Sequence, residues 1–295
     1  MPDSNMVVDT EILKRFRPWS GVVPAGFFAY FLGNLTRADY WAFSPEIRAI
    51  YDRERHEAFS TPSVDDNIFD WLVLLEAVAE ARDTFMMAAL GAGWGRWLVA
   101  GAFAARQRGL PSRLIGVEAE PTHFQWMRQH FADNGLNPAD HQLIEAAASG
   151  RSGRAWFYFG KPDSWYGQSI IHDPVLDQSS ADETEHEYNG EKARLVRTID
   201  LTELLAPYSH IDYLHMDIQG AELDVLSSAP AILSAKVKRI LVGTHSAEVE
   251  EGIRQLLSAA GWRAQYDFPL NTELRVNDTV VTLGDGVQAW INPSL

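Results

Sequence analysis

The 295-residue chain contains no cysteine, which excludes disulfide bonds, cysteine-ligated zinc or iron–sulfur centres and a thiol nucleophile. It also lacks an apolar run of the ~18–20 residues needed to cross a bilayer; the longest candidate, 21–33, is broken by Pro24. Basic residues are few, with 25 Lys and Arg against 40 Asp and Glu, and the formal charge of −15 argues against a nucleic-acid partner. Residues 1–16 mix acidic and basic side chains, unlike a secretory signal. These absences predict a cytoplasmic protein that binds neither nucleic acid nor a membrane.

From Thr84 onward, short apolar runs alternate with stretches of helical period, the pattern of an α/β fold with a mostly parallel sheet. The expected strands are 85–90, 114–118, 142–146, 213–217 and 239–243, and the expected helices are 96–108, 121–134, 201–206, 221–227 and 247–260. Near the C-terminus, 262–268, 279–283 and 288–291 look like strands without helices between them. The turn signals at 277–278 and 284–286 favour a terminal antiparallel strand pair.

The first 82 residues are rich in aromatic side chains and lack this alternation, so we expect a mostly helical cap on the substrate side of a domain spanning 83–295. Within the cap, 44–59 has a helical period and 67–82 is a strongly amphipathic helix. A third segment, 173–192, holds seven acids and a single Lys. It is predicted to be a solvated insertion between short strands at 155–159 and 195–197.

A glycine-rich turn follows the strand at 85–90 and runs directly into a helix. Its glycines, Gly91, Gly93 and Gly95, let the backbone turn sharply and approach a ligand closely, and Ala92 lies between them. Glu118, followed by Ala119, ends the next strand, where a carboxylate can accept hydrogen bonds from both ribose hydroxyls. The combination predicts a nucleoside cofactor. The Gly-x-Gly-x-Gly spacing favours S-adenosylmethionine, while a nicotinamide dinucleotide on a Rossmann fold stays open as the alternative.

A second constellation surrounds the strand at 213–217. Asp217 lies at its carboxyl end, Gly220 permits the turn, and Glu222 opens the next helix. Two carboxylates in one such turn can hold a metal, position a substrate hydroxyl or bind the ammonium of a methionine moiety; helix capping is the alternative. His245 ends the neighbouring strand at the same edge and is a candidate general base.

The segments LGAGWGRW, VEAEP, YLHMDIQGAE and LVGTHS together resemble the FkbM-type family of S-adenosylmethionine-dependent methyltransferases. The resemblance covers residues 69–295 and implies a class I, Rossmann-like methyltransferase fold. It also implies O-methylation of a hydroxyl on a natural product, such as a macrolide, polyketide or glycoside, or on a sugar. By the same resemblance, Gly91, Gly93, Gly95 and Glu118 match the cofactor motifs, and Asp217 and Glu222 match the DxxGxE turn.

Two positions depart from the family pattern. An acid commonly stands two residues before the first glycine of the loop and engages the methionine end of the cofactor, whereas this chain has Ala89. Another group, with Glu222 as one candidate, would then take that role. His215 stands where the family motif leads us to expect Lys.

Methyl transfer to an alcohol needs positioning and removal of a proton. His245 and Asp217 are the candidate bases, and Mg²⁺ on Asp217 and Glu222 is the other route. Trp165, Tyr166 and Gln168 are expected to form the substrate wall for a small-molecule or glycan acceptor. A homo-oligomer is compatible with the sequence. A non-enzymatic relative that binds the cofactor poorly remains a third interpretation.

Overall fold

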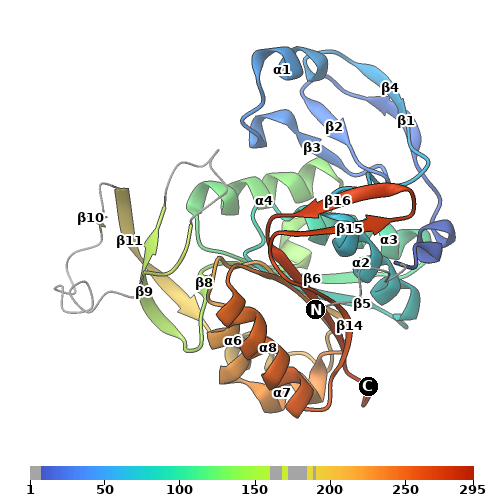
Figure 1. The fold of residues 1–295 in the computed structure, drawn as a ribbon. Coiled ribbons are helices and arrows are strands. Elements are labelled where there is room, and N and C mark those ends of the chain that lie inside the picture. Colours follow the sequence, from blue (N-terminus) through green and yellow to red (C-terminus); the bar gives the residue numbers. More distant parts are fainter. Residues whose placement is uncertain (1–7, 160–167, 172–184, 189–190) are drawn as a thin grey trace.

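The computed structural model describes residues 8–159, 168–171, 185–188 and 191–295, and its centre is a seven-stranded sheet (Figure 1). The strands in the order β13-β12-β5-β6-β7 run parallel, and β17 and then β14 extend the β13 edge in antiparallel pairing. This sheet confirms the predicted α/β class, mostly parallel with a terminal antiparallel strand pair. Its members are β5 (Phe85–Leu90), β6 (Ser112–Glu118), β7 (Gln142–Glu145), β12 (Tyr213–Met216), β13 (Arg239–Thr244), β14 (Arg263–Phe268) and β17 (Gly286–Ile291).

Each face of the sheet carries its own layer of helices. Along β5, Met87 and Ala89 point into one core and Ala88 and Leu90 into the other, as the alternation of a strand requires. The first core is closed by α2 (Ile68–Glu80), α3 (Arg96–Gln107) and α4 (Pro121–Asp133). The second is closed by α5 (Leu201–Leu205), α6 (Glu222–Ser228), α7 (Pro230–Lys236) and α8 (Ala247–Ala259). Figure 1 shows α6, α7 and α8 together on one side of the sheet and α2, α3 and α4 on the other.

The elements predicted from residue 67 onward to form this core agree with the structure to within two residues at each end. The sequence did not indicate α7, nor the strand β15 (Thr272–Val276). The predicted strand 279–283 is β16 (Thr279–Leu283), but it pairs with β15 in a separate hairpin rather than joining the central sheet.

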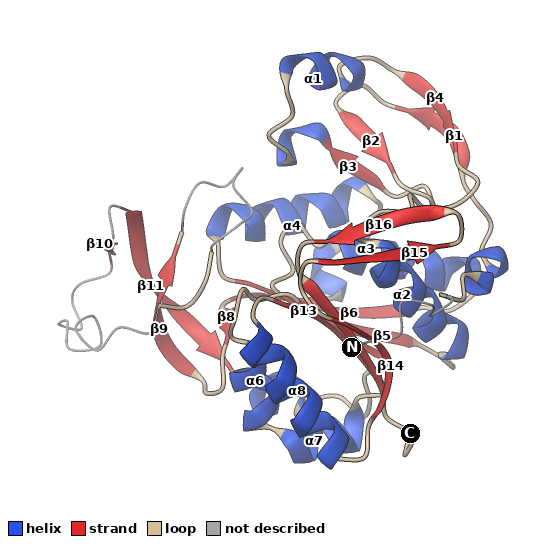
Figure 2. Cartoon of the chain, viewed as in Figure 1, coloured by secondary structure: helices blue, strands red, loops and turns tan. Residues whose placement is uncertain are grey.

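The N-terminal region contains more strand than predicted. Two antiparallel pairs, β1 with β4 and β2 with β3, lie in it beside short helices (Figure 2). The elements are η1 (Glu11–Arg15), β1 (Ser20–Val23), β2 (Phe27–Ala29), β3 (Leu35–Arg37), η2 (Ala38–Tyr40), α1 (Pro45–Tyr51) and β4 (Arg55–Ala58). The helix expected over 44–59 therefore ends at Tyr51, because 55–58 pairs with 20–23, a contact that local periodicity does not reveal. The longest helix of the region, α2, packs on α3 and β13; the division of the chain at residue 82 stays a prediction.

A second, smaller sheet joins β8 (Ala147–Ala148), β9 (Gly153–Tyr158), β10 (Glu185–Tyr188) and β11 (Glu191–Ile199). The acidic segment 173–192 was predicted to be a loop, yet 185–188 is strand β10, paired antiparallel with β11. Most of the rest of that segment lies outside the described residues.

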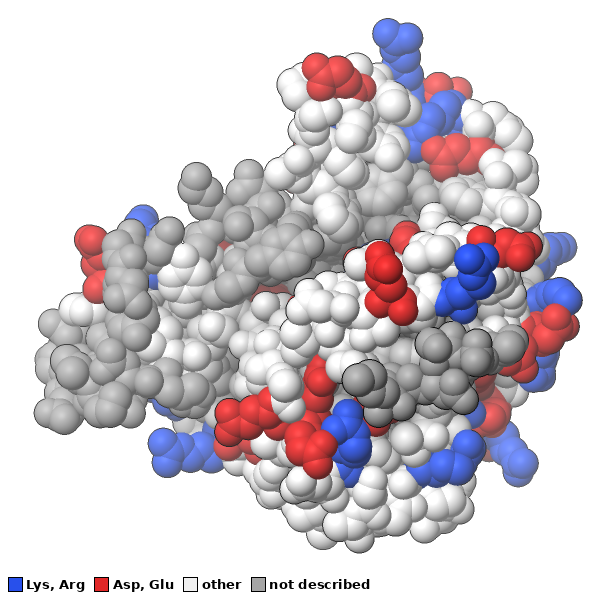
Figure 3. All heavy atoms as spheres, viewed as in Figure 1, with Lys and Arg blue, Asp and Glu red and all other residues white. Residues whose placement is uncertain are grey.

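None of the helices in the described part of the chain is both long and apolar enough to span a membrane. On the face drawn in Figure 3, Lys and Arg side chains are scattered among acidic ones rather than gathered in one patch.

Candidate functional site

The glycine loop between β5 and α3 has the backbone conformation that its sequence predicts. Gly91, Gly93 and Gly95 have φ angles of +69°, +54° and +75°, in the left-handed region that side chains disfavour. A Cβ on Gly91 would lie 1.8 Å from the carbonyl oxygen of Asp217, so the strand ends β5 and β12 approach each other only because position 91 is glycine. Gly95 meets a different neighbour, since a Cβ there would lie 3.0 Å from Cγ of Met127 in α4.

Glu118 lies at the end of β6, next to this loop, and its side chain is buried. Its Oε2 accepts a hydrogen bond from the N–H of Gly93 at 2.7 Å, and its Oε1 accepts one from the N–H of Glu120 at 2.8 Å. Burial raises the pKa of Glu118, although His123 and the two N–H donors act in the opposite direction. A carboxylate has about four acceptor positions. Glu118 can therefore hold the loop and still accept hydrogen bonds from ligand hydroxyls.

A cavity of about 290 Å³ opens along this edge of the sheet. Most of the predicted cofactor residues line it, namely Gly91, Ala92, Gly93, Glu118, Ala119 and Asp217. Gly95, also predicted to bind the cofactor, is not on the wall and instead allows α3 to pack on α4. The cavity is also lined by residues that sequence analysis did not assign to the site, among them Trp41, Asp66, Arg96, His215 and Asp285.

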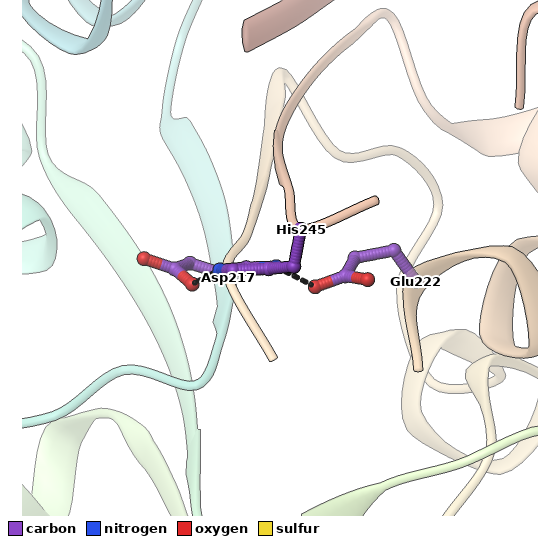
Figure 4. A group of neighbouring side chains, drawn as sticks. All are labelled: Asp217, Glu222 and His245. Carbon is purple, nitrogen blue, oxygen red and sulfur yellow. Dashed lines mark hydrogen bonds and ion pairs between the residues drawn. The ribbon is translucent and has the colours of Figure 1, made fainter. Parts of the chain in front are cut away.

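The predicted catalytic residues form a line at the carboxyl ends of β12 and β13. His245 lies between Asp217 and Glu222 (Figure 4). Its Nδ1 is 2.9 Å from Oε1 of Glu222, and its Nε2 is 3.3 Å from Oδ1 of Asp217 and 3.9 Å from Oδ2 of Asp285. Asp217 reaches the cavity wall, whereas His245 and Glu222 lie behind it. The structure thus brings all three together but gives only Asp217 direct access to a ligand.

The charges in this line decide the protonation of the imidazole. Burial lowers the pKa of His245, but the hydrogen bonds and charges of Asp217 and Glu222 outweigh it and raise the pKa from 6.5 to about 10. For Asp217, burial raises the pKa, and the hydrogen bond and charge of His245 more than offset this and lower it. The raised pKa favours the imidazolium form of His245 over a neutral general base, which makes Asp217 the stronger of the two candidate bases. The assignment of the base stays a prediction.

Asp285 and Gln219 complete the cavity wall near this line. The side-chain amide of Gln219 lies 3.1 Å from Oδ1 of Asp217 and 2.8 Å from Nε2 of His245. Burial raises the pKa of Asp285, against the lowering effect of His245. Asp285 was missed because its Gly-Asp-Gly context was interpreted only as a hairpin turn.

Asp217, Glu222 and His245 also have the spacing of a cation site, since one ligand atom from each lies within 4.8 Å of the others. However, Oε1 of Glu222 already accepts the N–H groups of Ile218 and Gly220, at 3.2 and 3.1 Å, in addition to His245. The ring of His245 contacts both carboxylates, 3.3 Å from Asp217 and 2.9 Å from Glu222. The donor set therefore suits a metal only after His245 has lost its proton and Glu222 has given up hydrogen bonds.

The predicted substrate wall is only partly described. Gln168 lines the cavity, and its Nε2 donates to the carbonyl oxygen of Phe159 at 3.0 Å. Trp165 and Tyr166 lie outside the described residues. A different aromatic pair is present: Trp41 of the N-terminal region packs edge-on against Trp94 of the glycine loop, with ring centroids 5.0 Å apart.

A Rossmann-like sheet with this loop and these strand-end acids is an arrangement that class I methyltransferases share, and the comparisons with known proteins place the chain in that class. Within that class, the family model of the methyltransferase FkbM domain matches residues 89–266. A protein of Jannaschia sp. (strain CCS1), named only as a methyltransferase, is 31% identical over 263 residues, which cover 87% of this chain and 89% of that protein. The chain belongs to the FkbM methyltransferase family.

Solved structures with similar folds include the methyltransferase FkbM of Methylobacillus flagellatus KT, with a TM-score of 0.43 and 13% identity, covering 76% of this chain and 58% of that one. Precorrin-6y C5,15-methyltransferase of Geobacter metallireducens GS-15 has a TM-score of 0.45 and 9% identity, covering 89% of this chain and 98% of that one.

Proposed function

We propose that the protein is an S-adenosylmethionine-dependent O-methyltransferase that acts on a hydroxyl of a small natural product, such as a macrolide, polyketide or glycoside, or of a sugar. One observation carries the proposal. Asp217 stands on the cavity wall beside the glycine loop, and the hydrogen bond and charge of His245 lower its pKa although burial raises it. An ionised carboxylate at that point can receive the proton of an acceptor hydroxyl while the methyl group is transferred.

The cofactor end of the cavity fits an adenosyl group. Glu118 retains acceptor positions for ribose hydroxyls, and Gly91 and Gly93 leave no Cβ between the loop and a ligand. S-adenosylmethionine, when bound, supplies an electrophilic methyl group on a sulfonium centre. A nicotinamide-dependent oxidoreductase, the alternative considered from the sequence, is not retained because the chain belongs to a methyltransferase family.

The chain's own residues have three tasks in this reaction. Asp217 accepts the hydroxyl proton, a contribution of about 10²–10⁴-fold for a positioned base. His245 holds Asp217 in place by its hydrogen bond and is in turn oriented by the buried Glu222, so both are positioning residues. Asp285, with a raised pKa and a place on the same wall, accepts a hydrogen bond from the acceptor or serves as the second proton acceptor.

Metal assistance through Asp217 and Glu222 is the second route. It would lower the pKa of the acceptor hydroxyl by coordination, but it requires Glu222 to release hydrogen bonds that it makes in this structure. We therefore expect methyl transfer to be unchanged by EDTA. Loss of activity in EDTA with recovery in Mg²⁺ would establish the metal route instead.

Two measurements test the proposal. Isothermal titration with S-adenosylhomocysteine should show binding, and transfer of labelled methyl from S-adenosylmethionine should be sought with a panel of macrolide, glycoside and sugar acceptors. Asp217→Asn should lower kcat by 10²-fold or more with little change in cofactor affinity, because it removes the base and keeps the shape. A wild-type protein without cofactor affinity would support the non-enzymatic interpretation, and a product methylated on carbon or nitrogen would contradict O-transfer. Cytoplasmic location and a homo-oligomeric state stay predictions.

A further inference from the structure

Ala89 has an unusual neighbour on the adjacent strand. The parallel register of β5 and β12 places His215 beside Ala89, on the face of the sheet covered by α2 and α3. His215 lines the cavity although its side chain is only 5% exposed, and its Nε2 lies 2.9 Å from Oδ1 of Asp70 in α2. The site next to the missing acid is thus occupied by an imidazole that carries a carboxylate behind it.

The hydrogen bond to Asp70 defines what His215 can offer a ligand. A carboxylate accepts hydrogen bonds, so the neutral tautomer that fits this contact carries its proton on Nε2. This leaves Nδ1 of His215 as an acceptor, and it is buried without a hydrogen-bond partner among the described residues. A buried acceptor left unpaired costs about 1–3 kcal/mol. A donor supplied by a ligand in the cavity would remove that cost.

Charged groups of both signs lie further along the same wall, just before α2 and at the first residue of α3. Asp66, Asn67 and Arg96 all line the cavity. Nη1 of Arg96 donates to Oδ1 of Asn67 at 3.0 Å, and Nδ2 of Asn67 donates to Oδ1 of Asp66 at 2.6 Å. The guanidinium of Arg96 is held between the rings of Tyr30 and Trp97, at 4.7 and 4.4 Å. A cation at the first residue of a helix is opposed by the helix dipole, so an anionic ligand shared with the helix N–H groups is the arrangement that suits both.

These two parts of the wall are adjacent. The ring of Trp97 packs against the ring of His215, with centroids 6.1 Å apart, and it also carries Arg96 on its face. The wall therefore offers a hydrogen-bond acceptor backed by negative charge and, one side chain away, a positive group. That is the charge pattern complementary to a zwitterionic α-amino acid.

We infer that this wall binds the amino-acid end of the cofactor, an inference that rests on the proposed function. The ammonium is held by Nδ1 of His215, backed by Asp70, together with Asp66, and the carboxylate is held by Arg96. The carboxylates of Asp66, just before α2, and of Asp70, within α2, thereby replace the acid that Ala89 does not provide.

Glu222, which sequence analysis considered as the replacement for this acid, is not placed to contact the amino-acid end of the cofactor. Its side chain is fully buried and does not line the cavity, and its Oε1 is bound to two backbone N–H groups and to His245.

The test compares two ligands by isothermal titration. S-adenosylhomocysteine carries the amino-acid end, whereas 5′-methylthioadenosine shares the adenosine and thioether but lacks that end. Asp66→Asn, Arg96→Met and His215→Phe should each weaken S-adenosylhomocysteine roughly 10- to 100-fold, the scale of hydrogen bonds to charged groups. The same variants should leave 5′-methylthioadenosine unchanged. As controls, Glu118→Gln should weaken both ligands alike, and Asp65→Asn, a neighbouring acid that is not on the wall, should weaken neither.

The outcomes separate this inference from the function on which it rests. If the wild type binds neither ligand, the proposed function fails. If the wild type binds S-adenosylhomocysteine and the three variants bind it equally well, or lose both ligands in parallel, the amino-acid subsite is elsewhere. Because Asp66 and Arg96 are not buried in the core, their variants keep the test decisive even if His215→Phe does not fold.

Discussion

The cationic state of His245 is a prediction that can be tested without knowing the acceptor. Asp217 and Glu222 face the ring from β12 and α6, and Asp285 faces it from the turn before β17. Against the lowering effect of burial, Asp217 and Glu222 raise the pKa of His245 from 6.5 to about 10. The substitution Asp217→Asn keeps a hydrogen-bond acceptor beside His245 and removes one negative charge. We expect it to lower the pKa of His245 by about one to two pKa units.

The magnitude follows from linkage between protonation and folding. One pKa unit corresponds to about 1.4 kcal/mol. A pKa of about 10 in the folded state and 6.5 in the unfolded chain therefore corresponds to a contribution of about 5 kcal/mol to the free energy of unfolding. Because the folded pKa is the higher one, this contribution is fully present below pH 6.5. It declines as the pH rises from 6.5 and is lost once the pH passes 10. The free energy of unfolding should therefore fall steadily over that range.

Two assays check this prediction. Proton NMR titration of the histidine Hε1 signals, with the His245 signal identified by its absence in His245→Gln, should show no midpoint near 6.5 for this residue. Urea denaturation at pH 6.5, 8 and 9.5 should show a free energy of unfolding that falls as the pH rises. The variant His245→Gln should lose this pH dependence, whereas the control His56→Gln, at an exposed site, should keep it. Once an acceptor is known, kcat/KM should be flat between about pH 5 and 9. A midpoint near pH 6.5 for the His245 signal would refute the reasoning. A value of kcat/KM that falls below pH 6.5 would refute it as well.

Two further predictions concern the glycine loop and the end of β6. Glu118→Gln should weaken the binding of S-adenosylhomocysteine by about 1.5–3 kcal/mol in calorimetry, since it removes a charged acceptor. Glu145→Gln, at the paired position of β7, should leave that binding unchanged. Equal affinities in the wild type and both variants would contradict the assignment of Glu118 to the ribose. Gly91→Ala should destabilise by more than about 2 kcal/mol in urea denaturation, because its Cβ would overlap the carbonyl of Asp217. Gly109→Ala has a similar φ of +72° and open space around it, and should cost only about 1 kcal/mol; similar losses for both would show that the close approach is not limiting.

The core of the fold could be predicted because its signals are local. The strand 85–90 is a continuous apolar run between Thr84 and Gly91, and its predicted bounds match β5 at both ends. The strands β1 and β4 were missed because their pairing joins 20–23 to 55–58, and neither segment is apolar enough to indicate a strand by itself. The hairpin strand β15 has only five residues, in which partly buried or buried positions alternate with the exposed and charged Glu273 and Arg275. So short an alternation does not predict a strand from the sequence.

The site shows the same division between local patterns and long-range contacts. The glycine spacing and the DxxGxE turn each lie within one short segment, so the sequence alone could single out Gly91, Asp217 and Glu222. The roles assigned to them stay predictions. The protonation of His245 cannot be derived from its own segment, because its pKa depends on two carboxylates that reach it from other segments.

Asp285 illustrates why the remaining wall residues had no recognisable pattern. Its position is determined by its neighbour Gly286, where a Cβ would lie 2.3 Å from Oγ1 of Thr244 and 2.3 Å from Oε1 of Glu250. Glu250 is buried in α8 and accepts hydrogen bonds from Oγ1 of Thr244 at 3.3 Å and from the N–H of Leu270 at 2.7 Å. The turn before β17 is thereby packed against the end of β13, beside His245. A single aspartate in a glycine-flanked turn becomes part of the site only through these contacts, which join residues that lie far apart in the sequence.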